Sequence, residues 1–243
     1  MNSDGERVPF TIADFNREDG SVSIIFQVVG ATTELLSQKK EGEYIEDFAG
    51  PLGKATVTEG KKKVAVIAGG VGCAIAYPLA KKFHEQGTDV HTVIGFRNSG
   101  LVILAEEFKA VSDKLVIMSD DGTVGCKGLV TDALRELIEN GENYDEVIAI
   151  GPLVMMKYVC ALTKEYGIKT VVSMNPIMID GTGMCGGCRL AVGGETKFAC
   201  VDGPEFDGHL VDFDEAIARS SMYRTFEARK REEMCNLLNK EVE

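Results

Sequence analysis

The sequence predicts an α/β domain between a strand-rich N-terminal part and a small C-terminal lobe. Apolar strand-like runs alternate with helical segments through the middle of the chain. Short strand patterns and turns fill the N-terminal part, and three of the seven cysteines fall within residues 180–200. We therefore expect three domains, at residues 1–57, 58–174 and 175–243.

Composition narrows the class of protein. The 243 residues are 44% hydrophobic and 26% charged, as in ordinary soluble domains. The net charge of −12 argues against a nucleic-acid partner, which requires a basic surface. The longest uncharged run, residues 64–80, is interrupted by glycines and is short for a membrane span. An odd number of cysteines and no apolar signal core in "MNSDGERVPF" predict a cytoplasmic protein with free thiols or metal ligands.

The N-terminal part is expected to begin with a strand pair. "VPFTIAD" (8–14) and "SVSIIFQVV" (21–29) have strand-like composition, and a polar turn ending in glycine separates them. A short helix is expected at 32–37, with Thr32 or Thr33 as its cap.

The middle of the chain predicts a parallel sheet that helices cover on both faces. Strands are expected at 64–68, 90–95, 115–118, 147–150 and 169–173. Helices are expected after the first strand to about residue 86, and at 101–111, 130–139 and 154–166. Residues 175–211 are expected to be irregular, and 213–240 to form a terminal helix that is either solvated or docks a partner.

The cysteines of the C-terminal lobe have the spacing of an iron–sulfur site. Thiolates are soft ligands that select zinc or iron–sulfur clusters. Asp180, Cys185, Cys188 and Cys200 give the pattern D-x4-C-x2-C-x11-C. Plant-type 2Fe-2S proteins use C-x4-C-x2-C and a distant fourth cysteine, so one carboxylate here replaces one thiolate. Structural zinc and unligated loop cysteines are the alternatives.

A glycine-rich turn follows the first strand of the α/β domain. Gly69, Gly70 and Gly72 in "VAVIAGGVGCAIAYPLAKKF" allow a backbone to approach a pyrophosphate at the start of a helix. The alternative is an ordinary tight turn between strand and helix, which also needs glycine. If the nucleotide interpretation holds, Gly72→Val should block binding without unfolding the domain.

Two stretches of the lobe resemble a known family. "NPIMIDGTGMCGGCR" and "KFACVDGPEFDGHLVDF" are similar to the small (alpha) subunit of NADH-dependent reduced ferredoxin:NADP oxidoreductase, the sulfide dehydrogenase beta subunit type. These subunits have a ferredoxin–NADP reductase-like fold, and the resemblance covers nearly the whole chain. The electron-transfer subunit of dihydroorotate dehydrogenase, a relative in the same superfamily, has cysteine where this chain has Asp180. The aspartate favours the ferredoxin:NADP branch.

The resemblance implies a flavin site in the N-terminal part. "ERVPFTI" resembles the Arg-x-Pro-x-Ser/Thr motif of ferredoxin reductases, and "VVGATTELL" supplies a second phosphate contact. The FAD-binding residues that it implies are Arg7, Pro9, Thr11, Gly30, Thr32 and Thr33. Family members carry about one more pair of strands before this arginine, so the flavin β-barrel is expected to be truncated and to retain FAD weakly. A plain β-hairpin followed by a helix cap is the alternative.

The resemblance also implies a second nucleotide segment and a function. In "IGPLVMMK", Gly151 and Pro152 would end a strand beside the nicotinamide, and Met155 would start the next helix as a further cofactor contact. Core packing is the alternative for Met155 and the expectation for Met156. The implied function is electron transfer between NAD(H) or NADP(H), FAD and a 2Fe-2S cluster. A large flavin and iron–sulfur subunit would complete a heterodimer and reach ferredoxin and NADP. A dihydroorotate dehydrogenase electron-transfer subunit and a zinc-stapled, nucleotide-binding regulatory module are the alternatives.

Overall fold

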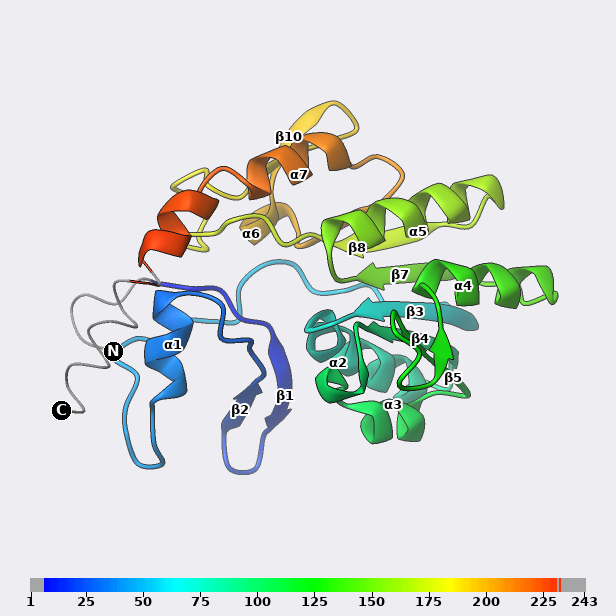
Figure 1. The fold of residues 1–243 in the computed structure, drawn as a ribbon, viewed down its shortest axis with the longest axis horizontal. Coiled ribbons are helices and arrows are strands. Elements are labelled where there is room, and N and C mark those ends of the chain that lie inside the picture. The colour runs from blue at the N-terminus through cyan, green and yellow to red at the C-terminus, as the bar shows by residue number, and fades with distance from the viewer. Residues whose placement is uncertain (1–6, 231, 233–243) are drawn as a thin grey trace.

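The computed structural model describes residues 7–230 and 232, in three parts (Figure 1). A seven-stranded sheet with helices on both faces forms the largest part. The N-terminal part contains β1 (Ile12–Asn16), β2 (Ser21–Ile24) and α1 (Ala31–Ser37), and the lobe that follows the sheet ends in a helix. The predicted fold class is confirmed. Within the described residues, no helix is long and apolar enough to cross a bilayer.

The large sheet has the strand order β11-β8-β7-β3-β4-β5-β6, and only the β11–β8 pair is antiparallel. Its strands are β3 (Lys63–Gly69), β4 (Asp89–Phe96), β5 (Lys114–Ser119), β6 (Cys126–Lys127), β7 (Glu146–Ile150), β8 (Thr170–Ser173) and β11 (Glu205–Asp207). Because the other strands are parallel, their carboxyl ends all meet at one edge of the sheet.

Both faces of the sheet are buried, as the continuous apolar strands predicted. The covering helices are α2 (Gly72–Glu85), α3 (Ala105–Val111), α4 (Val130–Glu139) and α5 (Leu153–Glu165). Side chains alternate along β3, so Ala65 and Ile67 pack with α4 and α5, whereas Val64 and Val66 pack with α2 and α3.

The N-terminal strands are shorter than expected. β1 starts at Ile12 rather than at residue 8, and β2 ends at Ile24 rather than at residue 29. In the described part of the chain, the segment before β3 therefore holds one two-stranded sheet, not a closed barrel. Phe15 in this hairpin is 58% exposed and Val29 in the segment after it is 60% exposed, so the N-terminal part leaves apolar surface uncovered.

Two further expectations were wrong in detail. The helix expected at 101–111 is a 3-10 turn at Ser99–Leu101 followed by α3, because Leu104 has a left-handed backbone (φ 58°) that separates them. The segment expected to be irregular, 175–211, contains the hairpin of β9 (Arg189–Val192) and β10 (Glu195–Phe198), then α6 (Ala199–Asp202) and β11. Gly193 and Gly194, both at positive φ, form the hairpin turn.

The terminal helix is broken. α7 spans Phe213–Ser220, a turn follows at 221–223, and helical backbone resumes at 224–230. Residues 231 and 233–240 of the helix expected at 213–240 lie outside the described residues.

Candidate functional site

A cleft of about 2100 Å³ lies at the carboxyl ends of the parallel strands, and the N-terminal part and the C-terminal lobe form its other walls. This position is where parallel α/β sheets bind ligands. Most residues singled out from the sequence line it: Arg7, Pro9, Thr11, Thr33, Gly69, Gly70, Gly72, Gly151, Pro152, Met155, Asp180 and Cys200. Gly30, Thr32, Cys185 and Cys188 are not among its lining residues.

Gly72 is required by close packing against backbone, whereas Gly69 packs against a flexible side chain. A Cβ atom on Gly72 would lie 2.5 Å from the carbonyl oxygen of Ile150 and 2.9 Å from Cα of Gly151. One on Gly69 would lie 2.6 Å from the sulfur of Met155. The turn after β3 therefore packs directly against the turn after β7. Contrary to expectation, Gly72→Val would force two backbones apart, so it would disrupt folding before it tested ligand binding.

Gly70 differs from its neighbours. Its backbone is left-handed (φ 56°), and a Cβ atom there would meet no atom within 4 Å. Its N–H donates to the carbonyl of Gly95 at 2.9 Å, which ties the turn to β4. Val71 and Gly72, which begin α2, also line the cleft. The positive end of a 14-residue helix is thus at the cleft, as a pyrophosphate site requires.

The second βα turn lies beside the first. Pro152 and Met155 both line the cleft, and the Met155 side chain packs over Gly69 and Gly151. Met156 is fully buried in the core against α4, so the expectation for this residue is confirmed.

The predicted flavin motif lies on the N-terminal wall. Arg7, Pro9 and Thr11 line the cleft, and the Arg7 guanidinium is 3.8 Å from the Asp47 carboxylate, with both groups exposed. The Thr33 hydroxyl accepts from the N–H of Gly30 and of Val29 at 3.0 Å, so it holds the start of α1. Gly30, rather than either threonine, is the N-cap residue.

Cys188 and Cys200 are brought together from two segments of the lobe. Their Sγ atoms are 3.3 Å apart, and both residues are buried. The N–H of Cys200 points to the sulfur of Cys188 at 3.5 Å, and the N–H of Gly187 points to the sulfur of Cys185 at 3.4 Å. Backbone N–H groups aimed at sulfur suit an anionic iron–sulfur cluster, so these residues fit such a group.

The environment of Cys200 favours the neutral thiol over the thiolate. Burial, followed by the neighbouring Cys188, raises the pKa of the Cys200 thiol to about 11, whereas the N–H of Gly183 acts in the opposite direction. Without a metal the thiol is therefore protonated, and metal binding has to release its proton.

Asp180 holds the turn that carries Cys185. Its carboxylate accepts from the N–H of Thr182 at 2.8 Å and of Cys185 at 2.9 Å, and these bonds lower its pKa. Residues 7–230 and 232 contain no group of three or more His, Cys, Asp or Glu side chains already placed around a common metal position. The four residues therefore form two separate pairs. Asp180 accepts a hydrogen bond from the Cys185 N–H, and the sulfur of Cys188 contacts that of Cys200.

Sequence reasoning missed the segment that joins the lobe to the cleft. The N–H of Lys54 donates to the carbonyl of Gly203 at 2.7 Å, and the Thr56 hydroxyl donates to Glu205 at 2.6 Å. A Cβ atom on Gly181 would lie 3.1 Å from the Leu52 side chain. No local pattern marks these contacts, because their partners are more than a hundred residues apart.

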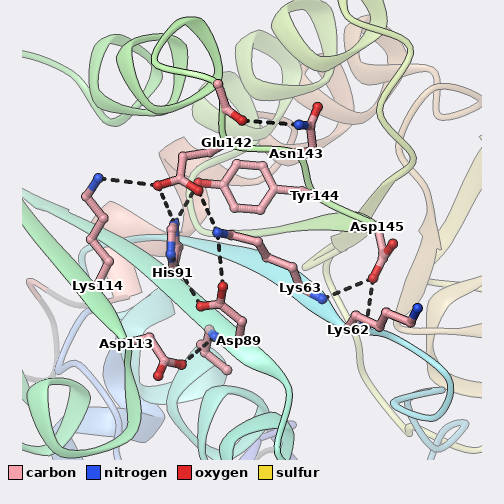
Figure 2. Close-up of polar contacts among 12 residues, drawn as sticks. Lys62, Lys63, Asp89, His91, Asp113, Lys114, Glu142, Asn143, Tyr144 and Asp145 are labelled. Atoms are coloured by element: carbon pink, nitrogen blue, oxygen red, sulfur yellow. Dashed lines mark hydrogen bonds and ion pairs between the residues drawn. The ribbon is translucent and has the colours of Figure 1, made fainter.

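A polar cluster occupies the opposite edge of the sheet (Figure 2). It joins the amino ends of β3, β4 and β5 to the loop before β7. His91 lies 2.9 Å from the Tyr144 hydroxyl and 3.3 Å from the Asp89 carboxylate, and Lys63 pairs with Asp89 and Glu142. These residues are remote from the cleft along the strands, and we assign them to stability.

Comparison with known proteins agrees with this arrangement. Residues 175–212 match the family described as the iron–sulfur cluster binding domain of dihydroorotate dehydrogenase B. The chain is 47% identical to a dihydroorotate dehydrogenase B (NAD+) electron transfer subunit homolog of Thermotoga maritima, over 92% of this chain and 79% of that protein. It is 51% identical to a protein encoded in the adh 3′ region of Clostridium beijerinckii, over 93% and 79%.

A solved structure supports the same relationship. The chain superposes on one from the NADH-dependent reduced ferredoxin-NADP oxidoreductase structure with a TM-score of 0.90 and 45% identity, covering 97% of this chain and 84% of that one. The resemblance seen in the sequence is therefore confirmed. The chain belongs to the family of electron-transfer subunits of flavin and iron–sulfur oxidoreductases that includes those of dihydroorotate dehydrogenase B.

Proposed function

We propose that this chain carries electrons between a nicotinamide nucleotide, FAD and a 2Fe-2S cluster, and that a large subunit couples it to ferredoxin and NADP. The observation that carries the proposal is the single cleft shared by the flavin motif, both glycine turns and two of the four proposed cluster ligands. Hydride carries two electrons and a cluster carries one, so a flavin bound in the shared cleft would convert between the two.

The N-terminal residues 1–57 would hold FAD in this proposal. Arg7 would pair with the pyrophosphate once released from Asp47, and Thr11 would hydrogen-bond the ring or its ribityl chain. Gly30, Thr32 and Thr33 would act through the backbone at the start of α1, because the Thr33 hydroxyl is already engaged.

Residues 58–174 would bind NAD(H) or NADP(H). Gly70 and the first turn of α2 would take the pyrophosphate, while Gly69 and Gly72 keep the turn tight. Gly151, Pro152 and Met155 would position the nicotinamide from the adjacent turn.

Residues 175–243 would hold the cluster through Asp180, Cys185, Cys188 and Cys200. Cys188 and Cys200 are already adjacent, and ligation would bring the Asp180–Cys185 turn toward them. When bound, the cluster supplies one-electron transfer to the partner subunit.

A second candidate is the electron-transfer role beside a dihydroorotate dehydrogenase. It is favoured by the match of residues 175–212 and by the names of several relatives. The cleft is the same in both candidates, so the large subunit decides between them.

Anaerobic co-expression with the gene for the large subunit tests the proposal. The purified complex should contain FAD and two irons per small-subunit cluster, be red-brown, and reduce NADP+ with electrons from NADH and reduced ferredoxin. Dihydroorotate-dependent NAD+ reduction would favour the second candidate. A colourless protein with zinc and no flavin would contradict both.

A further inference from the structure

One acidic side chain on the cleft wall is withdrawn from solvent. Glu205 is partly buried, and its Oε1 accepts from the Thr56 hydroxyl at 2.6 Å. Apart from Glu205 and the proposed ligand Asp180, each carboxylate that lines the cleft in the described part of the chain is exposed. These are Glu46, Asp47, Asp120 and Glu165. Glu205 is therefore distinguished by its position and not by its residue type.

The surroundings of Glu205 set its charge. It pairs with Ser173 across the β11–β8 ladder, on the sheet face that also carries Glu146. Burial is the main effect and raises the pKa of Glu205, and the Glu146 carboxylate raises it further, while the Thr56 hydrogen bond and Lys61 lower it. Lys61 is itself held 2.7 Å from Glu146. The carboxyl can thus hold a proton at a higher pH than a solvated glutamate.

The proposed function leaves a proton in this cleft, and the inference rests on that function. Oxidation of one NADH to NAD+ yields two electrons and one proton. If these electrons left one at a time through a bound cluster, the proton would remain in the cleft. A carboxylate that lines the cleft could accept this proton and pass it to water.

We propose that Glu205 is this proton acceptor. Its carboxylate takes the proton that NADH oxidation releases and passes it to water in the cleft when the cluster has been discharged. The Thr56 hydroxyl donates to Oε1 and holds the carboxylate in place, so Oε2 remains available for the proton.

Redox-difference infrared spectra of the holoprotein test this assignment directly. Reduction by NADH should produce a protonated-carboxyl band in the wild-type protein. The band should be absent in Glu205→Gln, which keeps the shape and the acceptor for Thr56, and shifted in Glu205→Asp. The matched control is Glu165→Gln, which replaces an exposed carboxylate of the same cleft and should keep the band.

Rapid mixing with NADH supplies the second readout. Glu205→Gln should leave flavin bleaching unchanged, slow cluster reduction by about 10- to 100-fold and abolish its pH inflection. A wild-type band and pH profile in Glu205→Gln would overturn the inference while leaving the proposed function intact. If NADH bleached neither the flavin nor the cluster of the wild-type protein, the proposed function would instead be contradicted.

Discussion

The Sγ atoms of Cys188 and Cys200 lie 3.3 Å apart although the two residues are twelve positions apart in the chain. The β9–β10 hairpin occupies most of that interval and returns the chain to the same place. Two of the proposed ligands are therefore preorganised, whereas Cys185 is positioned by the Asp180 turn. The four proposed ligands should for this reason respond differently to substitution.

Cys188→Ala and Cys200→Ala should each abolish the cluster, because either change leaves one thiolate of the preformed pair. Asp180→Ala should make the cluster labile, and Asp180→Cys should retain it with altered spectrum and potential, since a thiolate donates more electron density than a carboxylate. Iron content and electron paramagnetic resonance of the reduced proteins measure these outcomes. Cys126→Ser, at an exposed cysteine on β6, is the control. Unchanged spectra in both Asp180 variants would show that Asp180 only caps its turn.

The two glycine positions after β3 should separate folding from binding. Gly72→Val should lower the free energy of unfolding by about 3 kcal/mol or more, because the new side chain meets the backbone of residues 150 and 151. Gly70→Ala should cost only about 1–2 kcal/mol, for the left-handed backbone, and should weaken nucleotide binding by placing a methyl group at the cleft. Urea unfolding and nucleotide titration compare the variants. Equal stability of the two would contradict the packing assignment.

Long buried runs made the parallel sheet predictable. After a charged first residue, strands such as β3 and β7 are apolar to their ends, and this pattern needs no tertiary information. β11 has only three residues and is defined by its pairing with β8, so its sequence alone carries no strand signal. The β9–β10 hairpin had a usable signal in its Gly-Gly turn.

Parts of the candidate site could be predicted from the sequence where the residue type alone indicates the chemistry. Cysteine spacing indicated the proposed ligands, and the glycine turns that were singled out line the cleft. Glu205 could not be identified in this way, because its partner Thr56 is 149 residues distant and its burial depends on how β11 joins the sheet.

Stability should fall as pH decreases through the range of His91. Burial, and next the nearby Lys63, lowers the pKa of this histidine from its ordinary value of 6.5 in the folded chain. The unfolded chain therefore binds the proton more readily, so stability is complete above about pH 6.5 and decreases as pH falls below that value. In the His91→Asn variant, the urea concentration at the unfolding midpoint should vary less with pH between about pH 8 and pH 5.

His84→Asn, at an exposed position on α2, is the matched control and should leave the pH dependence unchanged. The Glu142 carboxylate, whose pKa is lowered mainly by its hydrogen bond with Lys63, should add a separate loss only below about pH 4.5. A pH dependence that persists in His91→Asn would assign the effect to other groups.

Lys61 and Lys169 should contribute unequally although both lie 2.7 Å from the Glu146 carboxylate. The Lys61 side chain is 12% exposed, bonds to the carbonyl of Val57 and lies over the Phe83 ring, whereas the Lys169 side chain is 63% exposed. Lys61→Met should therefore cost about 3 kcal/mol of unfolding free energy, because it leaves the buried carboxylate with one solvated partner. Lys169→Met should cost less than about 1 kcal/mol. Chemical denaturation at neutral pH gives both values, and equal losses would mean that burial does not govern this ion-pair triad.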